Sequence, residues 1–275
     1  MSLLNSLRRL TSRKTARRSV DGSSESDAAN SKSFSGDLAL FNSKFLSGEP
    51  FSLVRFGDGE MKIIQGEAID LSSKYNGEHK YVPGQAVDEQ QRVRLTESLK
   101  FQDTRYFVGI ACPCCVGIDN FMDLKKASGQ PESQLTWANI FVNANYHPFL
   151  EQTTPLFTNR KIAMVCHERA DLNGLPFTVE KRFSTGGNSW INDHQRVYQE
   201  LHDTFSSLEQ GDKDSWVVLF CAGVLSNILV KEMTIRHPGH TYIDLGSVYD
   251  SKMNLGKTRK YLKGSKNLKK VCVWA

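Results

Sequence analysis

Short, wholly apolar runs recur along this 275-residue chain, and they constrain its fold more than any other feature of the sequence. Two of them are 106–111 and 216–222, the run 161–166 is apolar after its first residue, Lys161, and stretches with helical spacing lie between them. Strands without polar alternation are typical of a parallel sheet that is covered on both faces, and parallel strands need crossover connections. The sequence therefore predicts an α/β fold, with a single Rossmann-like domain over 34–275. We expect a doubly wound, mostly parallel sheet with helices on both faces.

The same patterns predict where the other elements lie. Further strands are expected from Phe51 to the glycine at 57, at 177–183 and at 242–245, whereas 137–145 fits either a strand or a helix. Helices are expected at 35–46, 61–64, 88–101, 118–126, 192–208 and 224–233. The stretch 67–87 is polar and carries turn signals.

Basic residues gather at both ends of the chain. The first eighteen residues carry six arginines and lysines and no acid, 19–33 is polar, and 252–270 is again basic without an acid. We expect 1–33 to be a disordered arm, and both basic segments to be solvated or to touch anionic lipid or acidic glycan weakly. Neither segment has the interleaved aromatic residues of a single-strand platform, so a nucleic-acid partner is not expected.

The sequence also bears on the compartment. No apolar run is long enough to span a bilayer, and Met1–Leu10 lacks the apolar core and the cleavage site of a secretory signal. The six cysteines are scattered, which favours reduced thiols over a disulfide framework. A cytoplasmic protein is expected, with its basic arm as the part able to contact the inner face of the membrane.

Two carboxylates follow the strand that begins at Phe51. The run Arg55-Phe-Gly-Asp-Gly-Glu60 places Asp58 and Glu60 two residues apart beside an arginine. In extended or turning backbone such a pair can share one Mg²⁺ or Mn²⁺ with substrate phosphates, and the arginine can bind a phosphate through both arms of its guanidinium. Alternatively, Gly-Asp-Gly is an ordinary turn and the acids stabilise a helix start.

Other strand ends should meet the first at one edge of the sheet. Gly223 ends the strand 216–222 and opens a helix that contains Ser226, so its backbone N–H groups could face a phosphate, or the turn could need glycine for packing alone. Asp244 closes the next strand before Gly246, and it could bind a ribose hydroxyl or cap the turn. Asn188 lies in a Gly-Gly-Asn turn, either as an amide donor to phosphate or simply as a helix N-cap.

Cys112-Pro-Cys-Cys115 follows an apolar strand. A Cys-x-x-Cys between strand and helix is the layout of thioredoxin-like redox sites, but no later Thr-Pro or Ser-Pro offers the expected cis-proline strand. A zinc site lacks a second pair of ligands at a suitable spacing. Small buried thiols at a strand end are therefore expected.

The run Leu53-Val-Arg-Phe-Gly-Asp-Gly-Glu60 resembles the Asp-x-Glu motif region of the GT-D-type glycosyltransferases, a bacterial glycan-assembly family long labelled a domain of unknown function. The segments 217–229 and 242–247 resemble its strand–Gly–helix and Asp-hydrophobic-Gly pair, so the resemblance spans about 35–255. It implies that Asp58 and Glu60 support a divalent metal and catalysis. It also implies that Arg55 and Gly57 flank the nucleotide diphosphate, and that Gly223 and Asp244 line the donor cleft. The full predicted binding set is Arg55, Phe56, Gly57, Asn188, Gly223, Ser226, Asp244 and Gly246.

A metal-dependent glycosyltransferase is the function that this resemblance implies. It would move a hexose, typically glucose, from a nucleotide sugar such as UDP-glucose to a glycan or glycoconjugate, with Mn²⁺ or Mg²⁺ as cofactor. Two alternatives stay open. A phosphotransferase or hydrolase could use the same two acids, and a non-catalytic module could bind the sugar nucleotide without turning it over.

Overall fold

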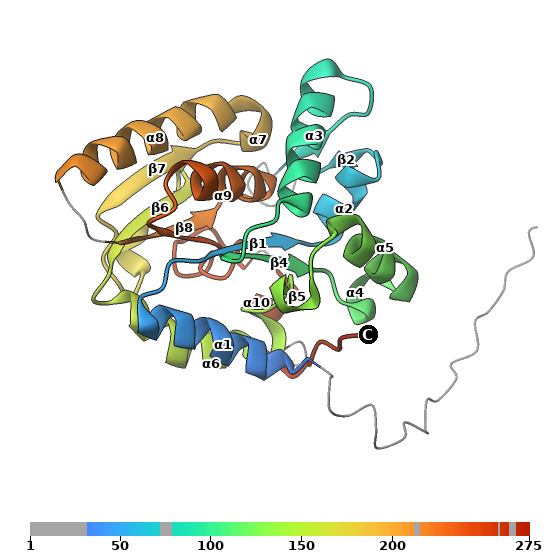
Figure 1. The fold of residues 1–275 in the computed structure, drawn as a ribbon, viewed down its shortest axis with the longest axis horizontal. Coiled ribbons are helices and arrows are strands. Elements are labelled where there is room, and N and C mark those ends of the chain that lie inside the picture. Colours follow the sequence, from blue (N-terminus) through green and yellow to red (C-terminus); the bar gives the residue numbers. More distant parts are fainter. Residues whose placement is uncertain (1–31, 72–78, 212–214, 258, 264–267) are drawn as a thin grey trace, which may run out of the picture. The chain divides into compact units, whose positions relative to one another are not determined.

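The fold is described from a computed structural model of the chain, for residues 32–71, 79–211, 215–257, 259–263 and 268–275 (Figure 1). The predicted arm over 1–33 lies almost wholly outside these residues, and its contact with a membrane stays a prediction. Within the described ranges, no helix combines the length and the apolar character that crossing a membrane requires.

One seven-stranded sheet forms the centre of the domain over 32–275, in the order β5-β4-β1-β9-β8-β6-β7, and every pairing in it is parallel. This confirms the predicted α/β, Rossmann-like fold. Its strands are β1 (Ser52–Phe56), β4 (Tyr106–Ile110), β5 (Leu135–Trp137), β6 (Lys161–His167), β7 (Lys181–Thr185), β8 (Trp216–Cys221) and β9 (Thr241–Asp244). A small antiparallel pair, β2 (Ile69–Asp70) and β3 (Lys80–Tyr81), lies within the stretch expected to be polar loop.

Helices cover both faces of the sheet (Figure 1). The longer ones are α1 (Phe34–Ser47), α3 (Ala86–Lys100), α5 (Ile118–Ser128), α8 (His194–Gly211) and α9 (Val224–Arg236). The shorter ones are α2 (Asp58–Ile64), α4 (Pro113–Val116), α6 (Tyr146–Pro148), α7 (Ser189–Asn192) and α10 (Lys260–Lys263). Single 3₁₀ or π turns are η2 (Glu132–Gln134), η3 (Asn143–Asn145), η4 (Phe149–Thr153), η5 (Thr154–Phe157) and η6 (Leu172–Gly174).

Alternate residues of each strand enter two separate cores, one on each face. In β1, Val54 and Phe56 pack with α3, α5, α8 and α9, whereas Leu53 packs with α1 and the aromatic residues around η4. Helix α1 shows how the sequence produces one of these layers. Its buried side chains are Phe34, Leu38, Phe41 and Phe45, which recur at helical spacing, and the Ser33 hydroxyl accepts from Gly36 N at 3.2 Å to cap the helix.

The strand order reverses between β1 and β9. From β1 the chain runs outward through β4 to β5, and it then crosses to β6 and β7 before returning through β8 to β9. Ligands of open α/β sheets bind at the carboxyl ends of the strands, at the point where the order reverses. The carboxyl ends of β1 and β9 carry Asp58 and Asp244, so the topology places two of the predicted site residues at this point.

Two of the strand predictions differ from the structure. The strand expected at 177–183 is β7 at 181–185, shifted toward the polar residues that follow, because its partner β6 pairs from Ala163 onward. The ambiguous stretch 137–145 is the end of β5 followed by turns, and Trp137 is fully buried in the core.

Candidate active site

A cavity of about 520 Å³ lies at the carboxyl ends of β1 and β9. Its walls combine acidic side chains, basic side chains and glycines, which come from segments far apart in the sequence. The polar side chains that line it are Arg55, Asp58, Glu60, His79, Asn139, Asn143, Asp244, Ser247, Arg259, Tyr261 and Lys270, and the glycines are Gly57, Gly59, Gly223 and Gly246. A second cavity of about 80 Å³ adjoins it and shares Gly223, Gly246 and Arg259. The volume of the larger cavity is typical of sites that bind small ligands.

Asp58 and Glu60 lie in the first turn of a helix rather than in extended backbone. Helix α2 begins at Asp58, one turn earlier than the sequence indicated, and residues two apart on a helix do not face each other. Glu60 Oε2 accepts from Gly57 N at 2.9 Å, so this carboxylate caps the helix, while Asp58 is exposed. Burial raises the pKa of Glu60, and the backbone N–H bonds oppose that rise. Of the two interpretations of this run, the acids at a helix start describe the backbone, and metal binding by the pair stays a prediction.

Arg55 holds the two central strands together at the floor of the cavity. Its Nε donates to Asp244 O at 2.7 Å, its Nη1 donates to Ala138 O at 3.0 Å, and its Nη2 lies 3.3 Å from Asp244 Oδ1. Three N–H directions of the guanidinium therefore point to protein acceptors. A phosphate bound through both arms of the Arg55 guanidinium, as predicted, would have to accept from the N–H groups that are not used in these three bonds.

Asp244 is buried and takes the capping role that the sequence left open. Its Oδ1 accepts from Gly246 N at 2.9 Å, which closes the turn after β9. Burial raises the pKa of Asp244 to about 6, and the Arg55 guanidinium limits that rise. The carboxyl lines the cavity, so the predicted contact with a ribose hydroxyl stays a prediction.

We expect the free energy of unfolding to decrease as the pH rises from about 4 to about 6 because of Asp244. In this range the unfolded chain has already lost the proton, whereas the folded carboxyl, with a pKa of about 6, still holds it. Rising pH therefore favours the unfolded chain until the folded carboxyl has titrated. Urea unfolding at several pH values should show the decrease, and the difference between the wild type and Asp244→Asn should isolate up to about 2 kcal/mol. An identical slope in both proteins would contradict the assignment.

Gly223 is in a backbone conformation that only glycine adopts readily, with φ 56° and ψ −135°, and it opens helix α9 toward both cavities. The turn therefore needs glycine for its own geometry, as the packing alternative held, and it also exposes the helix start to a ligand. Ser226 is fully buried, and its hydroxyl accepts from Ala222 N at 3.1 Å.

Three predicted binding residues line neither cavity. Phe56 is fully buried in the core, Ser226 is bonded within its own turn, and Asn188 Oδ1 accepts from Lys80 N at 2.8 Å and from Trp190 Nε1 at 3.0 Å. Asn188 is at the N-cap position of α7, but its side chain does not cap that helix. A direct contact of these three side chains with substrate would need a conformation other than this one.

Several cavity residues were not predicted. Arg259, Tyr261 and Lys270 come from the basic segment that was expected to be a solvated arm; that expectation is wrong for them, because Tyr261 is buried and its hydroxyl pairs with Ser247 at 3.0 Å. His79 lies against Gly59 and Gly223, where an added Cβ would approach the imidazole to 3.2 and 3.6 Å. No spacing in the sequence links these residues to the strand ends.

Comparisons with known proteins find solved structures that share this fold. No protein-family model matches the chain, and no curated protein gives a significant match. Among solved structures, one of domain of unknown function 1792 is 17% identical with a TM-score of 0.51, covering 80% of this chain and 82% of that one. A structure described as a new glycosyltransferase (DUF1792) from Streptococcus sanguinis is 14% identical with a TM-score of 0.53, covering 81% and 86%. A third, described as having a distinct glycosyltransferase fold, is 17% identical with a TM-score of 0.49.

The resemblance first seen in the motifs is therefore confirmed at the level of the fold. This chain has the fold of the DUF1792 structures, one of which is described as a glycosyltransferase.

Proposed function

We propose that this protein is a glycosyltransferase that moves a hexose, most simply glucose, from a UDP-linked donor to a glycan or glycoconjugate acceptor. The observation that carries the proposal is the cavity at the reversal of strand order, which combines the exposed Asp58 with Arg259 and Lys270 in a glycosyltransferase fold. A nucleotide sugar has an anionic diphosphate and a neutral sugar, and such a mixed cavity suits both parts.

The side chains of this cavity can bind a divalent cation, with Asp58 as the first ligand. Magnesium and manganese are often held by one or two carboxylates together with substrate phosphates, rather than by a complete protein cage. Asp58 would hold the ion, and the Glu60 oxygen that does not cap Gly57 is the second candidate. When bound, the ion would neutralise charge on the leaving diphosphate.

The chain's own residues supply the other requirements of the transfer. Arg259 and Lys270 place positive charge in the cavity, and the start of α9 at Gly223 offers backbone N–H groups to an anion. Glu60 and Gly57 fix the first turn of α2, which holds Asp58 in place. Arg55, bonded to Asp244, keeps the two strand ends together beneath the ligand.

Thermal denaturation with a panel of nucleotide sugars, with and without Mn²⁺, tests the proposal first. A ligand that binds only the folded state at 100 times its Kd stabilises the protein by about 2.7 kcal/mol, which is about 5–10 °C for a domain of this size. We expect one UDP-sugar to raise the Tm in the presence of the metal. The absence of a shift with every donor, together with a shift by free nucleotides, would instead favour a phosphotransferase or hydrolase.

Analysis of the products then separates the three functions. A transferase forms a glycoside and releases a nucleoside diphosphate, whereas a hydrolase or phosphotransferase releases phosphate or a nucleoside monophosphate. Donor binding without any turnover, in the presence of a panel of glycan acceptors, would identify a binding module and would contradict the proposal.

A further inference from the structure

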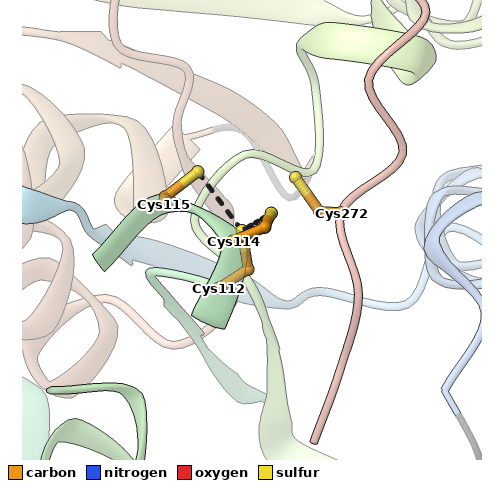
Figure 2. Close-up of side chains that lie close together, drawn as sticks. All are labelled: Cys112, Cys114, Cys115 and Cys272. Carbon is orange, nitrogen blue, oxygen red and sulfur yellow. Dashed lines mark hydrogen bonds between the residues drawn. The ribbon is translucent and has the colours of Figure 1, made fainter. Parts of the chain in front are cut away.

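Four cysteines meet beside the active-site cavity. Cys112, Cys114 and Cys115 lie at the start of α4, and Cys272 reaches them from the C-terminal segment (Figure 2). Their Sγ atoms all lie within 4.8 Å of one another. We call these four residues the cysteine cluster. The sequence offered no partner for Cys112–Cys115, and the fold supplies one from the far end of the chain.

The four sulfurs lie close enough together for a single ion to bind all of them. Four thiolates around a tetrahedral Zn²⁺, at about 2.3 Å from the metal, lie about 3.8 Å apart. In the cluster, Cys112 Sγ is 2.9 Å from Cys114 Sγ and 3.3 Å from Cys115 Sγ, and all four residues are free cysteines. An iron–sulfur cluster spreads its four cysteines over two or more iron atoms, so some of their sulfurs must lie farther apart than around one ion. The geometry therefore favours one tetrahedral ion.

The surroundings of the cluster suit thiolates. Lys270 Nζ lies 3.3 Å from Cys115 Sγ, Asn139 Nδ2 donates to the same sulfur at 3.3 Å, and Asn143 Nδ2 is 3.6 Å from Cys272 Sγ. Four thiolates around Zn²⁺ carry a net charge of −2, and a neighbouring ammonium with amide N–H donors stabilises that charge. Cys112 and Cys272 are buried, while Cys114 and Cys115 are exposed, so an ion can reach the site from solvent.

We propose that Cys112, Cys114, Cys115 and Cys272 bind one structural Zn²⁺. Each thiol gives its proton to solvent as its sulfur binds the ion, and no electron is transferred. With no position left for water or substrate, the ion has a structural role rather than a catalytic one. This inference does not depend on the proposed glycosyltransferase activity.

The proposed zinc would fasten the C-terminal segment to the sheet. Beyond Cys272, Val273 O accepts from Trp137 Nε1 at 3.2 Å, and the Trp274 ring contacts Phe121 and Trp137. Lys270 and Cys115 also line the large cavity. A metal that joins α4 to this segment would therefore stabilise one wall of the active site.

Metal analysis of the purified full-length protein tests the proposal. We expect about one zinc per chain after exhaustive dialysis, as for a closed four-cysteine site. Cys115→Ser removes an exposed ligand with little effect on the core, and Cys272→Ser removes the ligand from the C-terminal segment; each should lose most of the zinc. Cys221→Ser is the matched control, because Cys221 lies outside the cluster, and it should keep the wild-type zinc content.

A thiol count and a stability measurement complete the test. The denatured wild type with chelator should show six reactive thiols, since the chain has six cysteines and zinc binding leaves all of them reduced. Chelator should lower the Tm of the wild type and of Cys221→Ser, but not that of Cys115→Ser. If the wild type is purified without zinc and takes up no added Zn²⁺, the proposal is overturned. This holds whether the thiol count of that protein is six or four. Iron in place of zinc, or full zinc content in both ligand variants, would overturn it as well.

Discussion

Asp58→Asn should reduce glycosyl transfer by about 100-fold or more while leaving the fold intact, because it removes the exposed carboxylate proposed to hold the metal at the diphosphate. The asparagine is nearly the same size, and the loss of one negative charge at the start of α2 should cost only about 0.5 kcal/mol of stability. Initial rates with the identified donor at saturating Mn²⁺, and the Tm of both proteins, measure the two effects separately.

Two further variants make this result specific. Asp123→Asn removes the same charge from an exposed position on α5, outside both cavities, and should keep wild-type activity. Glu60→Gln keeps an oxygen that can accept from Gly57 N and so preserves the cap while removing the charge. A large loss of activity in Glu60→Gln with an unchanged Tm would assign Glu60 a role beyond capping. Full activity in Asp58→Asn would refute the site assignment.

Gly246→Ala should destabilise the protein by about 2 kcal/mol or more and abolish donor binding. A Cβ at this position would lie 2.0 Å from Arg55 Nη2, and the backbone φ of +55° is strained for any residue with a side chain. Arg55 cannot move away cheaply, because its other N–H groups bond to Asp244 O and Ala138 O at the floor of the cavity. Chemical denaturation and the donor-dependent rise in Tm are the measurements.

Gly239→Ala is the matched control for this substitution. An added Cβ at Gly239 meets no atom within 4 Å, and the backbone there is not left-handed, so stability should change little. The double variant Arg55→Ala, Gly246→Ala tests the cause. If the overlap with the guanidinium is responsible, the costs of the two single substitutions should add to more than the cost of the pair. Simple additivity would assign the effect to the backbone conformation alone.

The apolar runs predicted the sheet because burial on both faces leaves a strand no polar side. Tyr106–Ile110 and Trp216–Cys221 occur where the sequence placed them, and the glycine after the second strand does open a helix. Local patterns of this kind depend on neighbouring residues only. The start of α2 was left open because the Gly-Asp-Gly-Glu run fits both a turn and a capped helix, and the Glu60–Gly57 bond selects the helix.

Which residues line the large cavity depends on contacts between segments that are distant in the sequence. Asp58, Asp244 and Gly223 were predicted because they end strands, and strand ends converge in a parallel sheet. Tyr261 and Lys270 follow no strand, so their basic segment looked like solvated chain. They join the cavity because the segment packs back on the domain, where Lys270 O accepts from Ala144 N at 3.0 Å.

The sequence by itself determined the parallel sheet, the edge of the sheet at which the cavity lies and the carboxylates at that edge, since all three follow from periodicity and from residues that are neighbours in the chain. The tertiary structure alone decided what those residues touch. In the folded chain the guanidinium of Arg55 pairs with Asp244, and Cys272 lies beside Cys112, Cys114 and Cys115. A four-ligand site needs sulfurs that meet in space, and only the folding of the C-terminal segment onto α4 brings the fourth one there.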